Sequence, residues 1–341
     1  MVGLEVTNAS NNLAPAAGAA PALARAGIAS ASYRSASRAA LQIGCLILGY
    51  MGVYLCRKNF SVAVPLLQTA FNTDKAHLGA LDSYATIAYV AGKLFWGPNF
   101  VDRFGGRRCF FIVLLGVALF GGASALALSL PMLGACYMAN RFFGAGGWTS
   151  MVKLAAGWFP ARHVALTLAF LCLSIVFGGV AALLLAGQIA AASGNNWQAV
   201  LGLPSLVLLL IIGLCWLGLS PGEKAPRAHG PSATGWTYRG FFDLLKVPRL
   251  WILCGLSFAL TITRETFSFW TTDFFKTAGG AHTTPQQAAF LSIPFDAMGA
   301  VGILALGWLI DRVTHRQRKW LLFSILMCVA VATYVLPTLA R

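Results

Sequence analysis

The chain has 341 residues, of which 58% are hydrophobic and only 10% are charged, and its mean hydropathy is +0.72. Soluble globular domains carry about 25% charged residues, so this composition argues against a water-soluble enzyme or binding module. Segments of about 20 apolar residues recur along the chain, and each is long enough to cross a hydrocarbon core of about 30 Å. The sequence therefore predicts an all-α polytopic membrane protein.

The predicted elements follow one another in a simple order. Residues 1–38 are rich in Ala, Ser, Asn and Gly, lack the features of a signal peptide, and predict a disordered tail. Nine apolar spans follow, at 40–66, 77–100, 109–129, 131–153, 163–191, 198–219, 249–276, 286–310 and 319–340. The Pro/Gly-rich loop 220–248 separates a six-helix half (39–219) from three helices of a second half (249–341), and its "RGFFDLLK" predicts a short amphipathic surface helix.

Basic residues indicate the orientation of the chain in the membrane. Most Lys and Arg residues lie in the tail and in the loops after even-numbered spans, so the positive-inside rule predicts a cytoplasmic N-terminus. The formal net charge of +15 is then explained by topology, and we expect the lipid bilayer, not nucleic acid, as the partner of these loops. The eight cysteines lie within or beside apolar spans and form no CxxC pair, so we interpret them as packing residues and expect no metal site.

An internal repeat is visible in the charged residues. The segments "GPNFVDRFGGRR" after span two and "GWLIDRVTHRQRK" after span eight each place Asp-Arg at a helix end, before a basic cluster. The spacing from Arg57 to Asp102 is 45 residues (102 − 57), and that from Arg264 to Asp311 is 47 (311 − 264). Spans one and two therefore correspond to spans seven and eight. Two six-helix halves form the plan of major facilitator transporters, so we expect nine of twelve helices here and a chain that is incomplete at its C-terminus.

Arg57 stands inside an apolar run, where a charged side chain costs roughly 2.5–3.5 kcal/mol at the bilayer centre. It either extends to the membrane surface or faces a polar cavity. Tyr50, Tyr54 and Arg57 are spaced i, i+4 and i+7 and share one helix face, which favours the cavity. Lys58 points about 100° away around the helix, and we expect a structural role for it.

Three further cations lie inside predicted spans. Lys93 follows Tyr89 by four residues, so a phenol and a cation again share one helix face, as Tyr54 and Arg57 do. Lys93 either reaches the membrane surface or faces a cavity. Arg141 is either a site residue or a charge that packs helices together. Arg264 is the equivalent of Arg57 in the repeat and has the same two interpretations.

Two carboxylates accompany these cations. Glu265 adjoins Arg264 but lies on another face of the helix, so it need not neutralise Arg264 and is able to pair elsewhere. Asp296 either carries a proton or forms a salt bridge with one of the cations, and we prefer the salt bridge. Four interior cations against two acids favour a doubly negative guest, and the guanidinium fork of arginine matches phosphate oxygens.

Four segments of the sequence resemble the organophosphate:phosphate antiporters, a branch of the major facilitator superfamily. They are "YMGVYLCRKNFSVAVPLL", "AYVAGKLFWG", "GGWTSMVKLAAGWF" and "TRETFSFW", and the similarity runs from about residue 40 to the end. The resemblance implies that one arginine from the first helix of each half binds the substrate phosphate. The positions that match the family's anion-binding residues are Arg57, Arg264, Lys93, Tyr50, Tyr54, Tyr89 and Trp148. The candidates for coupling or gating are Asp296, Glu265, Arg141, Asp102 and Asp311.

The sequence departs from the family pattern at three places. Glycerol-phosphate members have a histidine in helix five, where this chain has Ser174 or Ile175, and an aspartate where Phe269 stands. One extra residue also separates Gly97 from Asp102. The first two departures leave the organic part of the substrate open, whereas the third is expected only to shift a loop.

The resemblance implies a secondary active transporter that exchanges small organic phosphates for inorganic phosphate by rocker-switch alternating access. The alternatives are a proton-coupled symporter of organic carboxylates such as sugar acids, or a sugar-phosphate sensor of the same fold that does not transport. An enzyme is not expected, because the sequence shows no nucleophile–base pair, no metal-ligand spacing and no phosphate-binding glycine loop. We expect no cofactor, a small anionic substrate, a monomer, and a location in the bacterial inner membrane.

Overall fold

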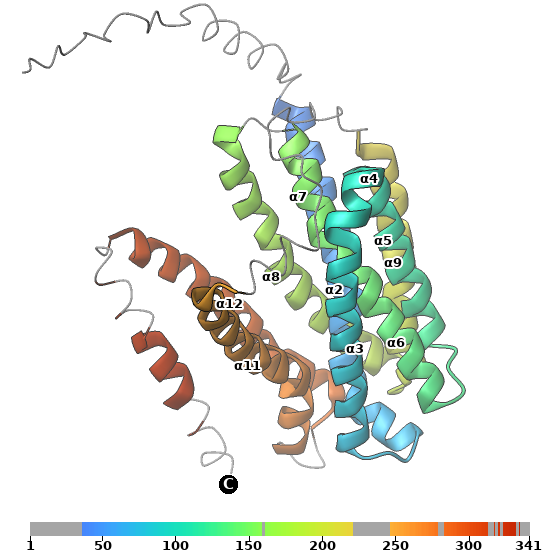
Figure 1. Ribbon diagram of the computed structural model, residues 1–341. Helices are drawn as coiled ribbons and strands as arrows, with labels where there is room; N and C mark the ends of the chain where they lie inside the picture. The colour runs from blue at the N-terminus through green and yellow to red at the C-terminus, as the bar shows by residue number, and fades with distance from the viewer. Residues whose placement is uncertain are drawn as a thin grey trace, which may run out of the picture.

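The computed structural model describes residues 36–158, 161–220, 246–278 and 283–312, together with residues 317, 320, 323–331 and 334. Within these ranges the chain forms helices joined by short turns, and no strand is present, which confirms the all-α prediction (Figure 1). The elements are α2 (Ala36–Ala70), α3 (Lys75–Phe95), the π-helix η1 (Trp96–Val101), α4 (Asp102–Phe104), α5 (Gly106–Ser124), α6 (Leu130–Gly144), α7 (Gly146–Trp158), α8 (Ala161–Ala192), α9 (Trp197–Gly218), α11 (Pro248–Ala278) and α12 (Pro285–Arg312).

Local sequence signals explain several helix ends. Asp74 caps α3 by accepting a hydrogen bond from the backbone N–H of His77 at 2.8 Å, and Asn196 caps α9 by accepting one from Gln198 at 2.9 Å. The predicted span 77–100 ends as the π-helix η1, whose sequence contains a proline that has no backbone N–H to donate. These caps and breaks are local, so they follow from short stretches of sequence.

The single helix predicted at 131–153 is wrong in one respect, because the structure divides it into α6 and α7 at Ala145. Glycines flank this break, and a Cβ on Gly146 would lie 2.7 Å from ring atoms of Trp96. Glycine has a low helix propensity, and here it also lets η1 pack closely, so both effects favour an interruption.

Several predictions meet the limits of the described residues. The tail predicted at 1–38 lies outside them up to residue 35, while residues 36–38 already belong to α2. The predicted amphipathic segment in loop 220–248 lies outside them except for its last residue, and of the span predicted at 319–340 the residues 323–331 are helical.

Five helical stretches are long and apolar enough to cross a membrane. They are Ala40–Ala70, Gly106–Ser124, Phe170–Ala192, Trp197–Gly218 and Leu250–Thr277. This finding supports a polytopic membrane protein, and the count of nine spans stays a prediction.

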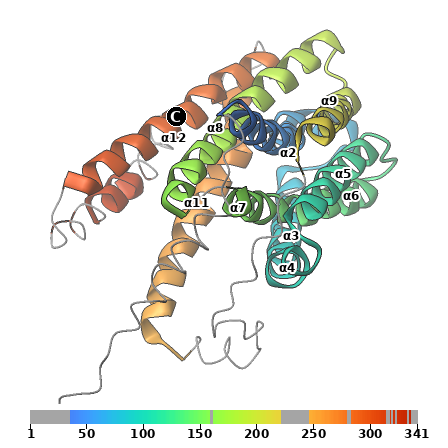
Figure 2. The same cartoon turned by 90° about the horizontal axis from the view of Figure 1, so that it is seen from above.

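Helices α2 to α9 pack together, and we call them the first bundle. Helix α2 lies at its centre and packs along both α8 and α9, while α5 contacts α6, α7 and α9 (Figures 1 and 2). The approach of α8 to α2 is close: a Cβ on Gly178 would lie 2.9 Å from the Cβ of Tyr54 and 3.1 Å from the Cα of Met51. Small residues at such crossings allow membrane helices to pack without a hydrophobic driving force. This packing holds the polar face of α2 in a fixed position.

Helices α11 and α12 contact the first bundle mainly at the end where α2 finishes and α3 begins. There the buried carboxylate of Asp273 contacts Lys75 at 2.6 Å and accepts a hydrogen bond from Gln68 at 3.2 Å, and Phe269 stacks on Phe60. Towards the opposite end, residues 251–262 of α11 are exposed and α12 leans away from α2 (Figure 1). We call these the closed end and the open end.

Candidate functional site

The polar face of α2 points into the first bundle. Tyr50 and Tyr54 are buried with their ring centroids 5.5 Å apart, and Trp148 of α7 lies 6.0 Å from Tyr50. The guanidinium of Arg57 lies 5.7 Å from the Tyr54 ring centroid and 5.3 Å from that of Tyr89 on α3. Aromatic faces stabilise a cation at such distances. Arg57 is therefore an interior residue and does not extend to the membrane surface.

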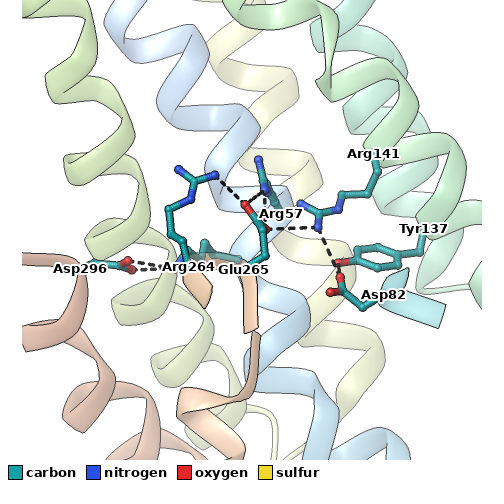
Figure 3. Close-up of polar contacts among 8 residues, drawn as sticks. Arg57, Asp82, Tyr137, Arg141, Arg264, Glu265 and Asp296 are labelled. Atoms are coloured by element: carbon teal, nitrogen blue, oxygen red, sulfur yellow. Dashed lines mark hydrogen bonds and ion pairs between the residues drawn. The ribbon is translucent and has the colours of Figure 1, made fainter. Parts of the chain in front are cut away.

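Glu265 of α11 contacts both Arg57 and Arg264, the two arginines that the sequence predicts to be equivalent. The Nη2 atom of Arg57 donates to both of its carboxylate oxygens at 2.9 Å, and Nη2 of Arg264 donates to Oε1 at 2.6 Å (Figure 3). The sequence left open whether Glu265 pairs with Arg264 or elsewhere, and in the structure it does both. The two Cβ atoms point in different directions, but their side chains are long enough to bend towards each other.

Arg141 of α6 lies beside this pair and is 5% exposed. Its Nη2 is 3.3 Å from Oδ1 of Asp82 and 3.6 Å from Oε2 of Glu265, and Tyr137 donates to Asp82 at 2.9 Å (Figure 3). An arginine that bridges carboxylates from two other helices holds α3, α6 and α11 together. Both interpretations of Arg141 therefore remain compatible with its position.

Asp82 and Tyr137 did not emerge from the sequence as site residues. A signal was present, because Asp82, Tyr89 and Lys93 are spaced i, i+7 and i+11 and so share one face of α3. Tyr137 and Arg141 are likewise four residues apart on α6. Asp82 lies early in its predicted span, where a carboxylate is easily assigned to the preceding loop, and it was therefore not predicted as a site residue.

Lys58 and Asp296 form a second ion pair between α2 and α12, with Nζ 3.0 Å from both carboxylate oxygens. This confirms the salt bridge expected of Asp296 and gives Lys58 as its partner. A Cβ on Gly179 of α8 would lie 3.0 Å from Oδ2 of Asp296, so the glycine leaves room for the carboxylate to pass α8. Lys58 thus links α2 of the first bundle to α12. Its direction on α2 could not predict this partner.

Lys93 lies 5.2 Å from the ring centroid of Tyr89, and among the residues that the structure describes no carboxylate forms an ion pair with it. The backbone of Asp102 begins α4, and Asp311 is the last residue but one of α12. Their side chains are not among the described ones, so their expected gating role stays a prediction.

Two small cavities share Arg57 and Arg141 in their linings. The first is lined by Arg57, Lys58, Ser61, Asp82, Tyr137, Arg141, Glu265, Ser268 and Phe269. The second is lined by Tyr50, Val53, Tyr54, Arg57, Tyr89, Asn140, Arg141 and Gly144. Guanidinium and phenol donors dominate the second lining, and such groups bind an oxyanion, whereas in the first lining the cations stand beside the carboxylates of Asp82 and Glu265. No group of three or more His, Cys, Asp or Glu side chains in the searched residues is arranged to hold a metal ion.

A helical membrane protein with a cation-rich interior between two groups of helices is the class that the fold and the site define. Residues 46–340 match the family model of the Major Facilitator Superfamily, and the chain belongs to this superfamily. A bacterial homologue of the human lysosomal transporter Spinster, in an inward-facing and unoccupied crystal structure, has the same fold. Its TM-score is 0.69 at 16% sequence identity, over 83% of this chain and 64% of that one.

Among characterised proteins, the chain is similar to transporters of sugar phosphates. It is 26% identical over 299 residues to a probable hexose phosphate transport protein of Chlamydia pneumoniae (80% of this chain, 64% of that protein). It is 25% identical over 322 residues to the hexose-6-phosphate:phosphate antiporter of Escherichia coli K12 (85% and 66%). A hexuronate transporter of Bacillus subtilis is 26% identical over 285 residues (80% and 64%). The chain thus spans slightly less than two thirds of these relatives, and they confirm the resemblance to organophosphate transporters.

Proposed function

We propose that the protein is a secondary active transporter of small organic phosphates, in which Arg57 and Arg264 bind the substrate phosphate together. One observation carries the proposal: a single carboxylate, that of Glu265, contacts both guanidiniums, at 2.9 Å and 2.6 Å. An anion of similar size can therefore bind both arginines at once. We call Arg57 and Arg264 the clamp.

The surroundings of the clamp supply further donors for such an anion. The phenols of Tyr50, Tyr54 and Tyr89 lie on the side of Arg57 that faces the second cavity, and Lys93 lies over the Tyr89 ring. A phosphate dianion has more acceptor oxygens and more charge than a carboxylate, so it uses this excess of donors better.

The proposal includes a transport cycle of the rocker-switch type, driven by exchange for inorganic phosphate. Contacts between the two groups of helices are concentrated at the closed end, which suits a state open at the other end. It also includes the division into an N-terminal half (39–219) and a second half (249–341), a monomeric protein in the plasma membrane, and a cytoplasmic N-terminus. The repeat supports the division into halves, and the distribution of basic residues supports the cytoplasmic N-terminus.

Exchange in proteoliposomes tests this function. Proteoliposomes that contain the full-length protein and are loaded with inorganic phosphate are expected to take up labelled phosphate or hexose phosphate without a proton gradient. Arg57→Lys is expected to lower exchange at least about 100-fold, because lysine lacks the planar fork that binds two oxygens at once. Full exchange by Arg57→Lys contradicts the clamp.

A second candidate function is proton-coupled transport of organic carboxylates, which the similarity to a hexuronate transporter favours. In that case uptake of a hexuronate depends on a pH gradient and is lost in Asp296→Asn, while phosphate exchange is absent. The same proteoliposomes, assayed with both substrates, separate the two candidates.

A further inference from the structure

Glu265 differs from the other carboxylates of the site in what it contacts. Asp82 pairs with Arg141 and Asp296 pairs with Lys58, and the structure pairs neither of these acids with a clamp arginine. The carboxylate of Glu265 lies between the two arginines of the clamp (Figure 3). It is 19% exposed, whereas Arg264 is 62% exposed. The charge of Glu265 therefore neutralises the part of the site that is proposed to bind substrate.

The Nη2 atoms of both arginines already donate to Glu265, so a substrate anion finds only the remaining N–H donors of each guanidinium and cannot take the bridging position between them while this carboxylate stays there. Binding at the clamp is then an exchange of one anion for another. The measured binding free energy is then the difference between the interaction free energy of the substrate with the clamp and that of Glu265 with the clamp.

Arg141 offers Glu265 a second position. Its Nη2 lies 3.6 Å from Oε2, too long for a strong hydrogen bond but within the range of an ion pair. A small rotation of the Glu265 side chain towards α6 shortens this distance and takes the carboxylate away from Arg264. Because a partly buried charge is costly without a partner, Arg141 makes the displacement feasible.

We propose that Glu265 is a built-in competitor for the clamp, which a substrate anion displaces towards Arg141, and that it sets specificity for doubly charged substrates. The inference rests on the proposed function, since it assumes that the clamp binds the substrate. A monocarboxylate replaces Glu265 with an equal charge and gains little. A phosphate dianion brings a second charge and a third oxygen to the same donors, and therefore binds preferentially.

Binding measurements on the full-length protein in detergent, by isothermal titration calorimetry, test this inference. The probes are inorganic phosphate and glucuronate. Glu265→Gln keeps the shape of the side chain but removes its charge, and is expected to tighten phosphate binding about tenfold or more, equivalent to about 1.4 kcal/mol. The preference for phosphate over glucuronate is expected to narrow in the same variant.

Asp82→Asn is the matched comparison. It removes the same charge from the same cluster, but its carboxylate pairs with Arg141 and Tyr137, not with the clamp. We expect it to tighten phosphate binding by at most about threefold, through long-range charge and a more available Arg141, because Glu265 still lies at the clamp. Equal effects of the two variants, or unchanged or weaker phosphate binding by Glu265→Gln, would overturn the proposal.

Glu265→Asp provides the answer if the glutamine variant does not yield folded protein. Its side chain is shorter by one methylene, so it bridges the two arginines less well, and phosphate is expected to bind about threefold more tightly than to the wild type. Unchanged or weaker phosphate binding contradicts the inference. If the wild type binds glucuronate and no phosphate, the proposed function fails, and the effect of Glu265→Gln on glucuronate affinity then decides the role of Glu265 separately.

Discussion

Arg57 and Arg264, whose positions the sequence predicts to be equivalent, have very different surroundings. The Arg57 side chain is 17% exposed and lies among the rings of Tyr54 and Tyr89, from two helices. Arg264 is 62% exposed, and the contact that orients it is with its own neighbour Glu265. The helices that pack around each position, and not its place in the predicted repeat, therefore decide how firmly the side chain is held.

The largest expected effect tests this difference directly. Arg57→Gln is expected to lower the free energy of unfolding by about 3 kcal/mol, because it removes the main partner of a largely buried carboxylate. Arg264→Gln is expected to change it by no more than about 1 kcal/mol, since Arg264 itself is mostly exposed and Glu265 keeps Arg57 as a partner. Unfolding in mixed micelles measures both. Equal losses would show that the two arginines are held alike.

The pair Lys58–Asp296 extends the comparison to the residue next to Arg57. Lys58→Met and Asp296→Asn are each expected to destabilise the protein, and the double variant less than the sum of both, with a coupling energy of about 1–2 kcal/mol. The reason is that each single change leaves a partner largely buried without its counter-charge. Additive losses would mean that the pair does not link α2 to α12.

The smallest expected effect concerns the closed end. Asp273→Asn is expected to weaken the contact with Lys75 by about 1 kcal/mol, which raises the population of molecules opened at this end about fivefold. A cysteine placed at the buried Ser292 reports this opening by its rate of maleimide labelling. Asp74→Asn serves as control, because Asp74 lies beside Lys75, is exposed and still has a capping side chain after the change. An unchanged labelling rate in Asp273→Asn would contradict the proposed contact.

The local parts of this site could be predicted from sequence. The i, i+4, i+7 spacing placed Tyr50, Tyr54 and Arg57 on one face of a helix, and the cost of a charge in an apolar span indicated an interior position. The structure agrees with both, because these side chains surround a common cavity. The salt bridge of Asp296 was also expected, since few partners other than a cation stabilise a carboxylate in such surroundings.

The pairing of these residues across helices was less predictable. Glu265 was assigned to another face from Arg264, yet it contacts Arg264 and Arg57 together. Lys58 was expected to be structural, and its partner on α12 is 238 positions away in the sequence. Helix periodicity fixes the direction of a Cβ atom. A long, flexible side chain then pairs with a charged group on a neighbouring helix, and the packing of the helices decides which group lies within reach.

The amino-acid sequence by itself determined that this is a helical membrane protein, where its main apolar spans lie, and which charges are placed inside them. These properties depend on local composition and on the 3.6-residue period of the helix. Only the tertiary structure decided that Glu265 lies between the two arginines, that Arg141 bridges Asp82 and Glu265, and that contacts between the helix groups gather at one end. Those arrangements depend on how closely the helices approach one another, at glycines such as Gly178 and Gly179, and no single helix contains that information.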